Sequence, residues 1–482
     1  MINEKPPWFI SLLRITIGFS VAITIALSYW VSGDAQEFIL GFMGAACLLV
    51  TAAPLFLRND YDLFEPATLV MLLVWFGVPF RIVYLIAAQD TDPHVADHVL
   101  FYQQPTAFLY GVFVVLVGLM FFAGGYALKL RIPAIHAVYL PSMTRWNTRR
   151  LELILLVIGG ISMICLVAFI LSAGVNFSSL STMSEKRFNG ARDAGSSRVM
   201  SPVYYLYRGA ALSKFVVYFG LVSLLTEKKK LVSWTGLWVL LFLFQTTLLS
   251  VILDSRASVI LLFVDCMILY FFVKRTFSIR LACCSLALAL GLTIPMLASR
   301  SSESGETPLQ GIVQKTFTGR NMLDIAKTCH VINGVPSKMD FRYGQMLYGW
   351  MFAPVPRSIM PNKPDWSNQG VYLNQEIFGF DGDLSGCPPG LIGELYWDFG
   401  LGGVWIGLFI FGFIFRQLHI TFRMCDYSPA SVLIYTIIIS RFVMFSLGND
   451  LGTGIVKAIL DLAPIYATLL IIGKWRTSAH SS

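Results

Sequence analysis

The sequence contains little charge: Asp, Glu, Lys and Arg together make up 13% of its 482 residues. Soluble domains carry about 25% of these residues, so the composition excludes an ordinary soluble globular protein. Hydrophobic residues make up 56% instead. Apolar runs of about 20 residues, the length that crosses the hydrocarbon core of a bilayer, recur along the whole chain. The sequence therefore predicts an all-α, polytopic membrane protein.

Several familiar motifs are also missing. The chain has no Walker A loop, no serine nucleophile elbow and no Cys-x-x-Cys pair, which argues against the chemistries that these motifs carry. No internal repeat is visible, and this argues against a transporter built from inverted repeats. The first apolar run is too long for the core of a cleavable signal peptide. The net charge of +8 has to be explained first by the distribution of Lys and Arg across the membrane. We predict no nucleic-acid partner.

The apolar runs predict about twelve transmembrane helices. They cover residues 8–31, 37–57, 67–88, 106–128, 151–173, 203–225, 232–252, 257–273, 281–298, 391–415, 429–447 and 455–473. Short loops rich in Lys and Arg stay on the cytoplasmic side. The loops 32–36, 89–105 and 448–454 contain neither residue, so we predict that these loops are outside and that both termini are cytoplasmic.

The predicted organisation has three parts. Residues 1–298 hold helices one to nine, residues 299–390 form a large outer loop with interfacial helices, one of them over 308–332, and residues 391–482 hold helices ten to twelve. The large loop and a second outer loop at 174–202 are rich in basic residues, which insertion does not require. We interpret these residues as an anion-binding surface at the outer membrane face. The alternative is that long loops cross the membrane regardless of their charge.

Ionisable residues inside the predicted helices are costly and indicate function. Arg256 follows Asp254 at the outer connection between helices seven and eight, and Arg441 lies in helix eleven. Arg256 either faces the outer vestibule or forms a local pair with Asp254. For Arg441, a buried Arg–Asp brace between helices explains the residue as well as substrate contact does.

The second half of the large loop combines prolines with basic residues. Four prolines between Pro354 and Pro364 favour an extended path that presents Arg357 and Lys363. A guanidinium group matches phosphate oxygens in a bidentate manner, and a lysine acts as a point charge. Together these residues suit a pyrophosphate at the level of the lipid headgroups. Such stretches are also common in loops without a binding role.

Two acids enter the tenth helix. Glu394 and Asp398 are four residues apart, so they share one helix face, and either one could act as a general base for a hydroxyl group. The alternative is a structural role, with the carboxylates paired to a loop arginine or accepting a hydrogen bond from a backbone amide.

Signals for metals and disulfides are weak. Asp381-Gly-Asp383 has the DxD form of metal-dependent sugar-nucleotide enzymes, and His94 and His98 have helical metal spacing, but a solvated turn and a short acidic loop explain both. We therefore predict no metal or other cofactor. Cys329 and Cys387 are the two cysteines of the large outer loop, where they are either bonded in an oxidising compartment or free.

The layout and its motifs resemble a known family. Twelve spans, an enlarged loop between the ninth and tenth, Pro356-Arg357, Lys363-Pro364 and the run Gly393-Glu-Leu-Tyr-Trp-Asp-Phe-Gly400 are similar to bacterial oligosaccharide repeat-unit polymerases. These are the Wzy-type polymerases of O-antigen and exopolysaccharide biosynthesis, which are relatives of the O-antigen ligases.

The resemblance implies a GT-C-like helical fold in the bacterial inner membrane, with the large loop in the periplasm, and a metal-independent glycosyltransferase. Such an enzyme moves the growing glycan from undecaprenyl pyrophosphate to the next lipid-linked unit, beside a flippase and a chain-length regulator. The implied catalytic residues are Glu394, Asp398 and Arg357. The implied pyrophosphate- and substrate-binding residues are Arg198, Arg256, Arg300, Arg320, Arg342, Lys363 and Arg441. An O-antigen ligase and a flippase or other transporter remain alternatives.

Overall fold

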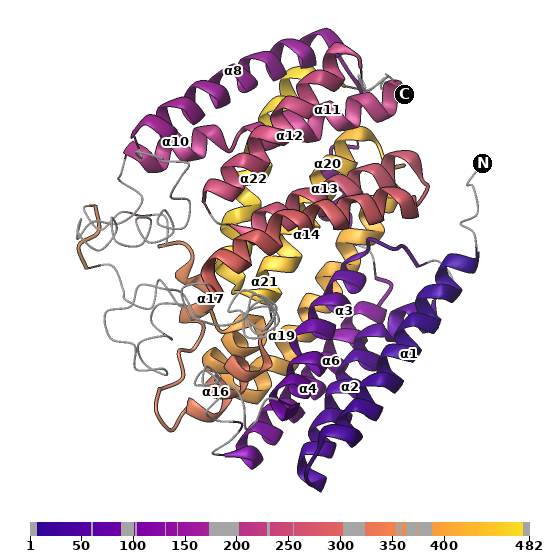
Figure 1. Cartoon of the computed structure of the whole chain (residues 1–482), viewed down its shortest axis with the longest axis vertical. Helices are drawn as coiled ribbons and strands as arrows, with labels where there is room; N and C mark the ends of the chain where they lie inside the picture. Colours follow the sequence, from indigo (N-terminus) through magenta and orange to yellow (C-terminus); the bar gives the residue numbers. More distant parts are fainter. Residues whose placement is uncertain are drawn as a thin grey trace, which may run out of the picture.

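The computed structural model describes residues 7–58, 61–87, 101, 104–130, 132–141, 143–172, 202–228, 232–253, 255–301, 323–352, 355, 359–362, 373 and 388–475. This part of the chain is a bundle of long helices with a single pair of short strands (Figure 1). The predicted all-α, polytopic architecture is confirmed.

The first half of the chain contains α1 (Pro7–Val31), α2 (Ala35–Leu57), α3 (Pro66–Gly77), α4 (Pro79–Ala87), α6 (Pro105–Ala127), α7 (Pro133–His136), the 3-10 turn η2 (Ala137–Tyr139), β1 (Met143–Trp146), α8 (Thr148–Ser172), α10 (Pro202–Ala210) and α11 (Ser213–Glu227). The second half contains α12 (Trp234–Ile252), α13 (Arg256–Lys274), α14 (Ile279–Ser301), α16 (Ile325–Gly334), α17 (Gln345–Gly349), α19 (Gly390–Met424), α20 (Pro429–Ile437), the π-helix η7 (Ile438–Val443), α21 (Met444–Gly448), α22 (Leu451–Ile472) and β2 (Gly473–Trp475).

Eleven helical stretches of the described chain are long and apolar enough to cross a membrane. They coincide with eleven of the twelve predicted spans. The remaining span, 281–298, corresponds to α14, whose apolar section Ile279–Ile294 is shorter. Three predicted spans consist of consecutive pieces rather than one regular helix: α3 and α4, α10 and α11, and α20, η7 and α21. In the first of these, Pro79 begins the second piece, as expected for a residue without a backbone N–H.

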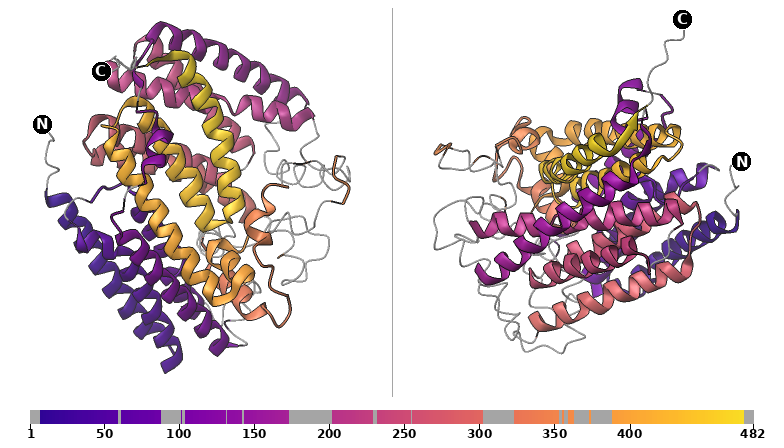
Figure 2. Two further views of the ribbon diagram at one scale, coloured as in Figure 1. Left: turned by 180° about the vertical axis from the view of Figure 1, so that it is seen from behind. Right: turned by 90° about the horizontal axis from the view of Figure 1, so that it is seen from above.

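The two ends of the bundle differ. The start of α1 and the end of α22 lie toward one end, whereas α16 and α17 lie toward the other (Figures 1 and 2); we call the latter the α16–α17 end. At the opposite end, β1 and β2 pair in antiparallel fashion, with Met143 beside Trp475 and Trp146 beside Gly473. This pairing joins the middle of the chain to the end of the last helix.

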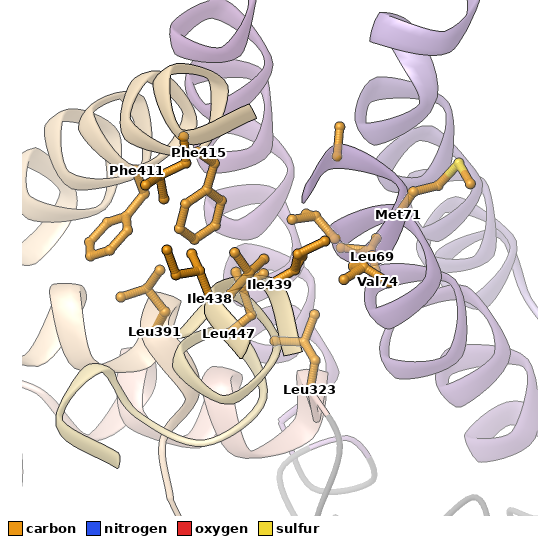
Figure 3. Packing of buried hydrophobic residues seen from close by; sticks show 14 of the residues in the cluster. Leu69, Met71, Val74, Leu323, Leu391, Phe411, Phe415, Ile438, Ile439 and Leu447 are labelled. Carbon is orange, nitrogen blue, oxygen red and sulfur yellow. The ribbon is translucent and has the colours of Figure 1, made fainter. Parts of the chain in front are cut away.

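Helices α6 and α19 pack against each other through glycines. A Cβ atom added at Gly125 would overlap the carbonyl oxygen of Phe409, and one added at Gly412 would overlap the carbonyl oxygen of Phe122. Small residues let helix backbones approach closely within a membrane. The apolar core continues beside this pair, where Leu69 of α3 lies near Ile439 of η7 (Figure 3).

Helix α19 is broken at Gly400. This residue has φ 63° and ψ −150°, a combination that is essentially restricted to glycine. The break turns the first segment, Gly390–Phe399, back along the second. As a result, the Leu395 side chain lies 2.6 Å from the position that a Cβ atom of Gly407 would occupy. We call Gly390–Phe399 the folded-back segment. It contains both acids that the sequence analysis singled out.

The large loop is anchored to the bundle by α16. Arg81 of α4 donates a hydrogen bond of 3.0 Å to Asp324, whose carboxylate also caps the first turn of α16. Ile325 and Cys329 are buried, and α16 packs on α6 and α19. The described part of the predicted 308–332 helix is therefore packed inside the protein and not exposed on its surface, and its interfacial depth stays a prediction.

Candidate functional site

Glu394 lies in the folded-back segment with no exposed surface. Its Oε2 atom accepts a hydrogen bond of 2.8 Å from the backbone N–H of Leu451, the first residue of α22. Asp450 caps the same helix through the N–H and hydroxyl of Thr453. The first turn of a helix leaves backbone N–H groups without helical partners and carries partial positive charge. The N-terminus of α22 is thus neutralised by two carboxylates of the protein itself.

Asp398, which is also fully buried, performs the same task for α17. Its two carboxylate oxygens accept hydrogen bonds of 3.1 Å from the backbone N–H groups of Met346 and Leu347. The N–H groups of Arg342 and Tyr343 donate to the carbonyl oxygens of Trp397 and Asp398 at 3.0 Å. The end of the folded-back segment therefore supports this part of the large loop through hydrogen bonds.

These contacts agree with the structural alternative for both acids, a hydrogen bond from a backbone amide. The two carboxylates lie on one segment, as predicted from their spacing, but each faces a different helix. Glu394 joins α19 to α22, and Asp398 joins α19 to α17. Their catalytic roles stay predictions.

Two substitutions distinguish a positioning role of Glu394 from a role as a general base. Glu394→Gln retains an oxygen that can accept the N–H of Leu451, so a positioning residue should tolerate it with a small loss of stability, about 1 kcal/mol or less. Glu394→Ala leaves that buried N–H unpaired and should cost about 1–3 kcal/mol. Thermal unfolding of the purified protein in detergent measures both. A general base would instead show unchanged stability and complete loss of activity in Glu394→Gln.

Arg342 is the one predicted anion-binding residue of the large loop whose side chain the structure describes. Its guanidinium carbon lies 6.0 Å from the centre of the Trp397 ring, within the range of cation–π attraction. The guanidinium also lies near enough to Asp398 to act on it electrostatically. Arg342 is therefore positioned where the large loop meets the folded-back segment.

Arg441 lies in a buried group of charges near the middle of four spans. Its Nε donates to Asp461 of α22 at 2.8 Å, and its Nη2 donates to Asp265 of α13 at 2.9 Å. Lys214 of α11 also donates to Asp461, and Tyr218 of α11 donates to Asp265. We call Lys214, Tyr218, Asp265, Arg441 and Asp461 the central ion cluster. It favours the interhelical brace over substrate contact for Arg441.

A second buried polar group lies toward the opposite end, where the α2–α3 connection meets α19 and α20. Glu65 accepts from Arg58 at 2.8 Å and lies 3.2 Å from Nε2 of His419, which also lies 3.3 Å from Asp62. The other ring nitrogen of His419 is 2.6 Å from the Tyr435 hydroxyl. Arg416 lies 3.5 Å from Glu65. We call Asp62, Glu65, Arg416, His419 and Tyr435 the histidine cluster.

The acids of both clusters were not predicted from the sequence. The predictions concerned the basic residues of the spans and not the carboxylates that partner them. Asp265 and Asp461 each interrupt an apolar run, and this was a usable signal, because an acid in a span is as costly as a base. His419 was equally visible as an ionisable residue within an apolar helix.

The structure does not show where the side chains of the remaining predicted site residues lie relative to these groups. Arg198, Arg320, Arg357, Lys363 and Cys387 lie outside the described residues, as do Asp254, the Asp381-Gly-Asp383 turn, His94 and His98. Arg256 begins α13 and Arg300 lies near the end of α14, but their side chains are not described. Among the described residues, no group of three His, Cys, Asp or Glu side chains could hold a metal ion.

Cys329 is a free, fully buried thiol. Its sulfur lies 3.6 Å from the carbonyl oxygen of Phe108, and a Cβ atom added at Gly111 of α6 would lie 2.5 Å from it. Of the two alternatives left open for Cys329, the structure shows the free thiol, which α16 packs against α6 inside the bundle.

Comparisons with known proteins identify no relative: no family model, no curated protein and no solved structure matches this chain.

Proposed function

We propose that this protein polymerises lipid-linked oligosaccharide repeat units at the outer face of a bacterial inner membrane. The growing glycan leaves undecaprenyl pyrophosphate and is transferred to the next lipid-linked unit. In this arrangement both termini are cytoplasmic and the α16–α17 end faces the periplasm. The proposal rests on the layout and motifs of the sequence, which resemble repeat-unit polymerases.

One structural observation carries the proposal further: the large loop is mounted on the bundle through buried carboxylates. Asp324 holds α16 through Arg81, and Asp398 holds α17 through two backbone amides. A loop fixed in this way can present its cations in a preorganised arrangement. Arg342, stacked near Trp397, is the described member of that arrangement.

The proposed glycosyl transfer requires such an arrangement of cations and a base for the hydroxyl proton. The acceptor hydroxyl oxygen forms a bond to the anomeric carbon of the donor sugar. The bond from that carbon to the pyrophosphate oxygen breaks, its electron pair stays on the pyrophosphate, and the hydroxyl proton passes to a base. Guanidinium groups stabilise the charge that develops on the leaving pyrophosphate. Glu394 and Asp398 hold the loop and α22 in register for this step, and Glu394 is the base to be tested.

The length distribution of surface glycans in a deletion strain tests the proposal. Wild type should restore long chains, and Arg342→Ala should leave single repeat units on the surface. Lys338→Ala is the matched control, because Lys338 is an exposed cation in the same loop. Retention of long chains in the deletion strain would contradict the proposal. Accumulation of full-length glycan on undecaprenyl pyrophosphate would identify a ligase instead.

A transporter is the second candidate, and the central ion cluster favours it. Transporters place charges near the middle of the membrane, and Arg441, Asp265 and Asp461 lie near the middle of their spans. For a flippase, the deletion strain should lack even single repeat units at the outer face. The glycan experiment therefore separates all three functions.

A further inference from the structure

The two acids of the central ion cluster have different numbers of cationic partners. Asp461 accepts from both cations, Lys214 and Arg441. Asp265 accepts from Arg441 and from the neutral hydroxyl of Tyr218, both at Oδ2. If Asp265 became neutral, Asp461 would still have both cations beside it. If Asp461 became neutral, Lys214 would lose the one carboxylate with which it is paired in the described structure. Asp265 is therefore the acid whose charge the cluster can most readily lose.

The second oxygen of Asp265 supports this assignment. Asp265 has no exposed surface, and its Oδ1 atom accepts no well-formed hydrogen bond from a described residue. The Ser440 hydroxyl lies close enough to act on Asp265 but donates to the carbonyl oxygen of Thr436. A buried acceptor without a partner is costly when it belongs to a charged carboxylate. The cost falls when the carboxyl group is protonated, because the neutral acid needs less solvation. Oδ1 is thus the atom on which a proton is best accommodated.

The backbone at this position is irregular. Arg441 belongs to the π-helix η7, Ile438–Val443, and single π-turns within α-helices occur frequently at functional sites. The same turn places Ser440 where its hydroxyl accepts from Arg441 at 3.2 Å. An ion pair that only holds helices together does not require a π-turn to position its arginine. The π-turn at Arg441 therefore favours a functional role for the cluster.

The elements that pack on α13 contribute the following ionisable groups. Helix α11 gives Lys214 and Tyr218 in the cluster and Glu227 as its last residue, η7 gives Arg441, and α20 gives Tyr435, which lies in the histidine cluster. Helix α12 has none. Helix α14 has Arg280, Cys283 and Cys284, all exposed, and Arg300 near its end, whose side chain is not described. Asp461 of α22 completes the cluster, and Lys457 lies in the same helix.

One continuous helical stretch, α20 followed by η7, contributes to both the histidine cluster and the central ion cluster. In the histidine cluster, Nε of Arg416 is buried without a hydrogen-bond partner in the described chain, as are both amide atoms of Gln417, the next residue along α19. Such atoms are normally satisfied by internal water, and water beside histidine and tyrosine side chains can carry protons.

We propose that the central ion cluster is a proton-exchange site, with Oδ1 of Asp265 as the proton acceptor. Uptake forms an O–H bond on Asp265 and leaves Arg441 and Lys214 paired with Asp461. Release breaks that O–H bond and returns the proton to the aqueous phase. The proposal does not depend on the proposed function, because proton exchange needs no glycan substrate.

Infrared spectroscopy of the purified, full-length protein in liposomes tests the proposal. Because the chain has 28 Asp and Glu residues, the readout is a difference between variants. As the pH is lowered, wild type should gain one carboxyl carbonyl component that Asp265→Asn lacks. Asp324→Asn is the matched control, since it removes a buried carboxylate that also pairs with an arginine but lies in another part of the bundle. The band should be retained in this variant.

Two further measurements make the outcome decisive. Thermal unfolding establishes that Asp265→Asn is folded, and Asp265→Glu, which restores a titratable group, should recover the band. Spectra of wild type and Asp265→Asn that show the same change in the carboxyl band with pH would overturn the proposal. In that case the central ion cluster would be a permanently charged brace. Glycan polymerisation could fail or succeed in its own assay without affecting this result.

Discussion

Arg441→Met is expected to destabilise the helical bundle by about 3–5 kcal/mol. The substitution keeps the length and apolar stem of the side chain but removes the cation that joins Asp265 to Asp461. Asp461 retains Lys214, whereas Asp265 retains the hydroxyl of Tyr218 and no cation among the described residues. At a pH at which Asp265 is ionised, the cost is that of an uncompensated buried charge, which exceeds the net contribution of an intact ion pair. Thermal unfolding in detergent, followed by tryptophan fluorescence, measures the loss.

Lys457→Met is the matched control for this prediction. Lys457 is also a cation within a span, but its ammonium group lies 3.4 Å from the centre of the Phe445 ring, and no carboxylate is left buried in ion-pair contact when it is removed. Its loss should cost about 2 kcal/mol at most. The double variant Arg441→Met/Asp265→Asn should recover part of the lost stability, because it removes the orphaned charge as well. Equal effects of the two single substitutions would contradict the importance of the central ion cluster.

Gly125→Ala is expected to separate α6 from α19. A methyl group at this position would overlap the carbonyl oxygen of Phe409, a backbone atom that cannot rotate away as a side chain can. Overpacking of a tight interior costs about 1–3 kcal/mol and occasionally more, and here the two backbones have to move apart. We expect a value at the upper end of this range, with a large loss of folded protein in the membrane.

The neighbouring glycine provides the control. A Cβ atom at Gly124 would have no other atom within 4 Å, and alanine favours a helix over glycine by about 1 kcal/mol. Gly124→Ala should therefore be neutral or slightly stabilising. The yield of monodisperse protein in detergent and the midpoint of thermal unfolding compare the two variants. If both behave alike, the close approach of α6 and α19 does not determine stability.

The spans were largely predictable because a bilayer imposes a long apolar run on each crossing helix. The internal breaks were not. Gly400 has the same local sequence signal as Gly402 and Gly403, which remain within the helix. What distinguishes Gly400 is a φ of 63° that is set by the packing of Leu395 on Gly407. Such packing between separated residues has no periodicity that a single sequence could display.

The candidate site was predictable to a smaller extent. The spacing of Glu394 and Asp398 correctly placed them on one segment, but their partners are backbone amides of Leu451, Met346 and Leu347. Every residue has such an amide, so no side-chain pattern marks these partners. The position of Arg342 beside Trp397 likewise depends on the fold of the chain between them.

The pairing of β1 with β2 also bears on how the protein is made. Residues 143–146 leave the ribosome long before residues 473–475, and synthesis at about 5–20 residues per second separates the two by some tens of seconds. During that interval β1 lacks its native partner, as does Asn147, the residue before α8, whose N–H donates to the carbonyl oxygen of Ile472. Closure of this end of the bundle is therefore a late event in biogenesis. Inserted helices have to wait for it in the membrane, where chaperones and proteases can still reach the unpaired strand.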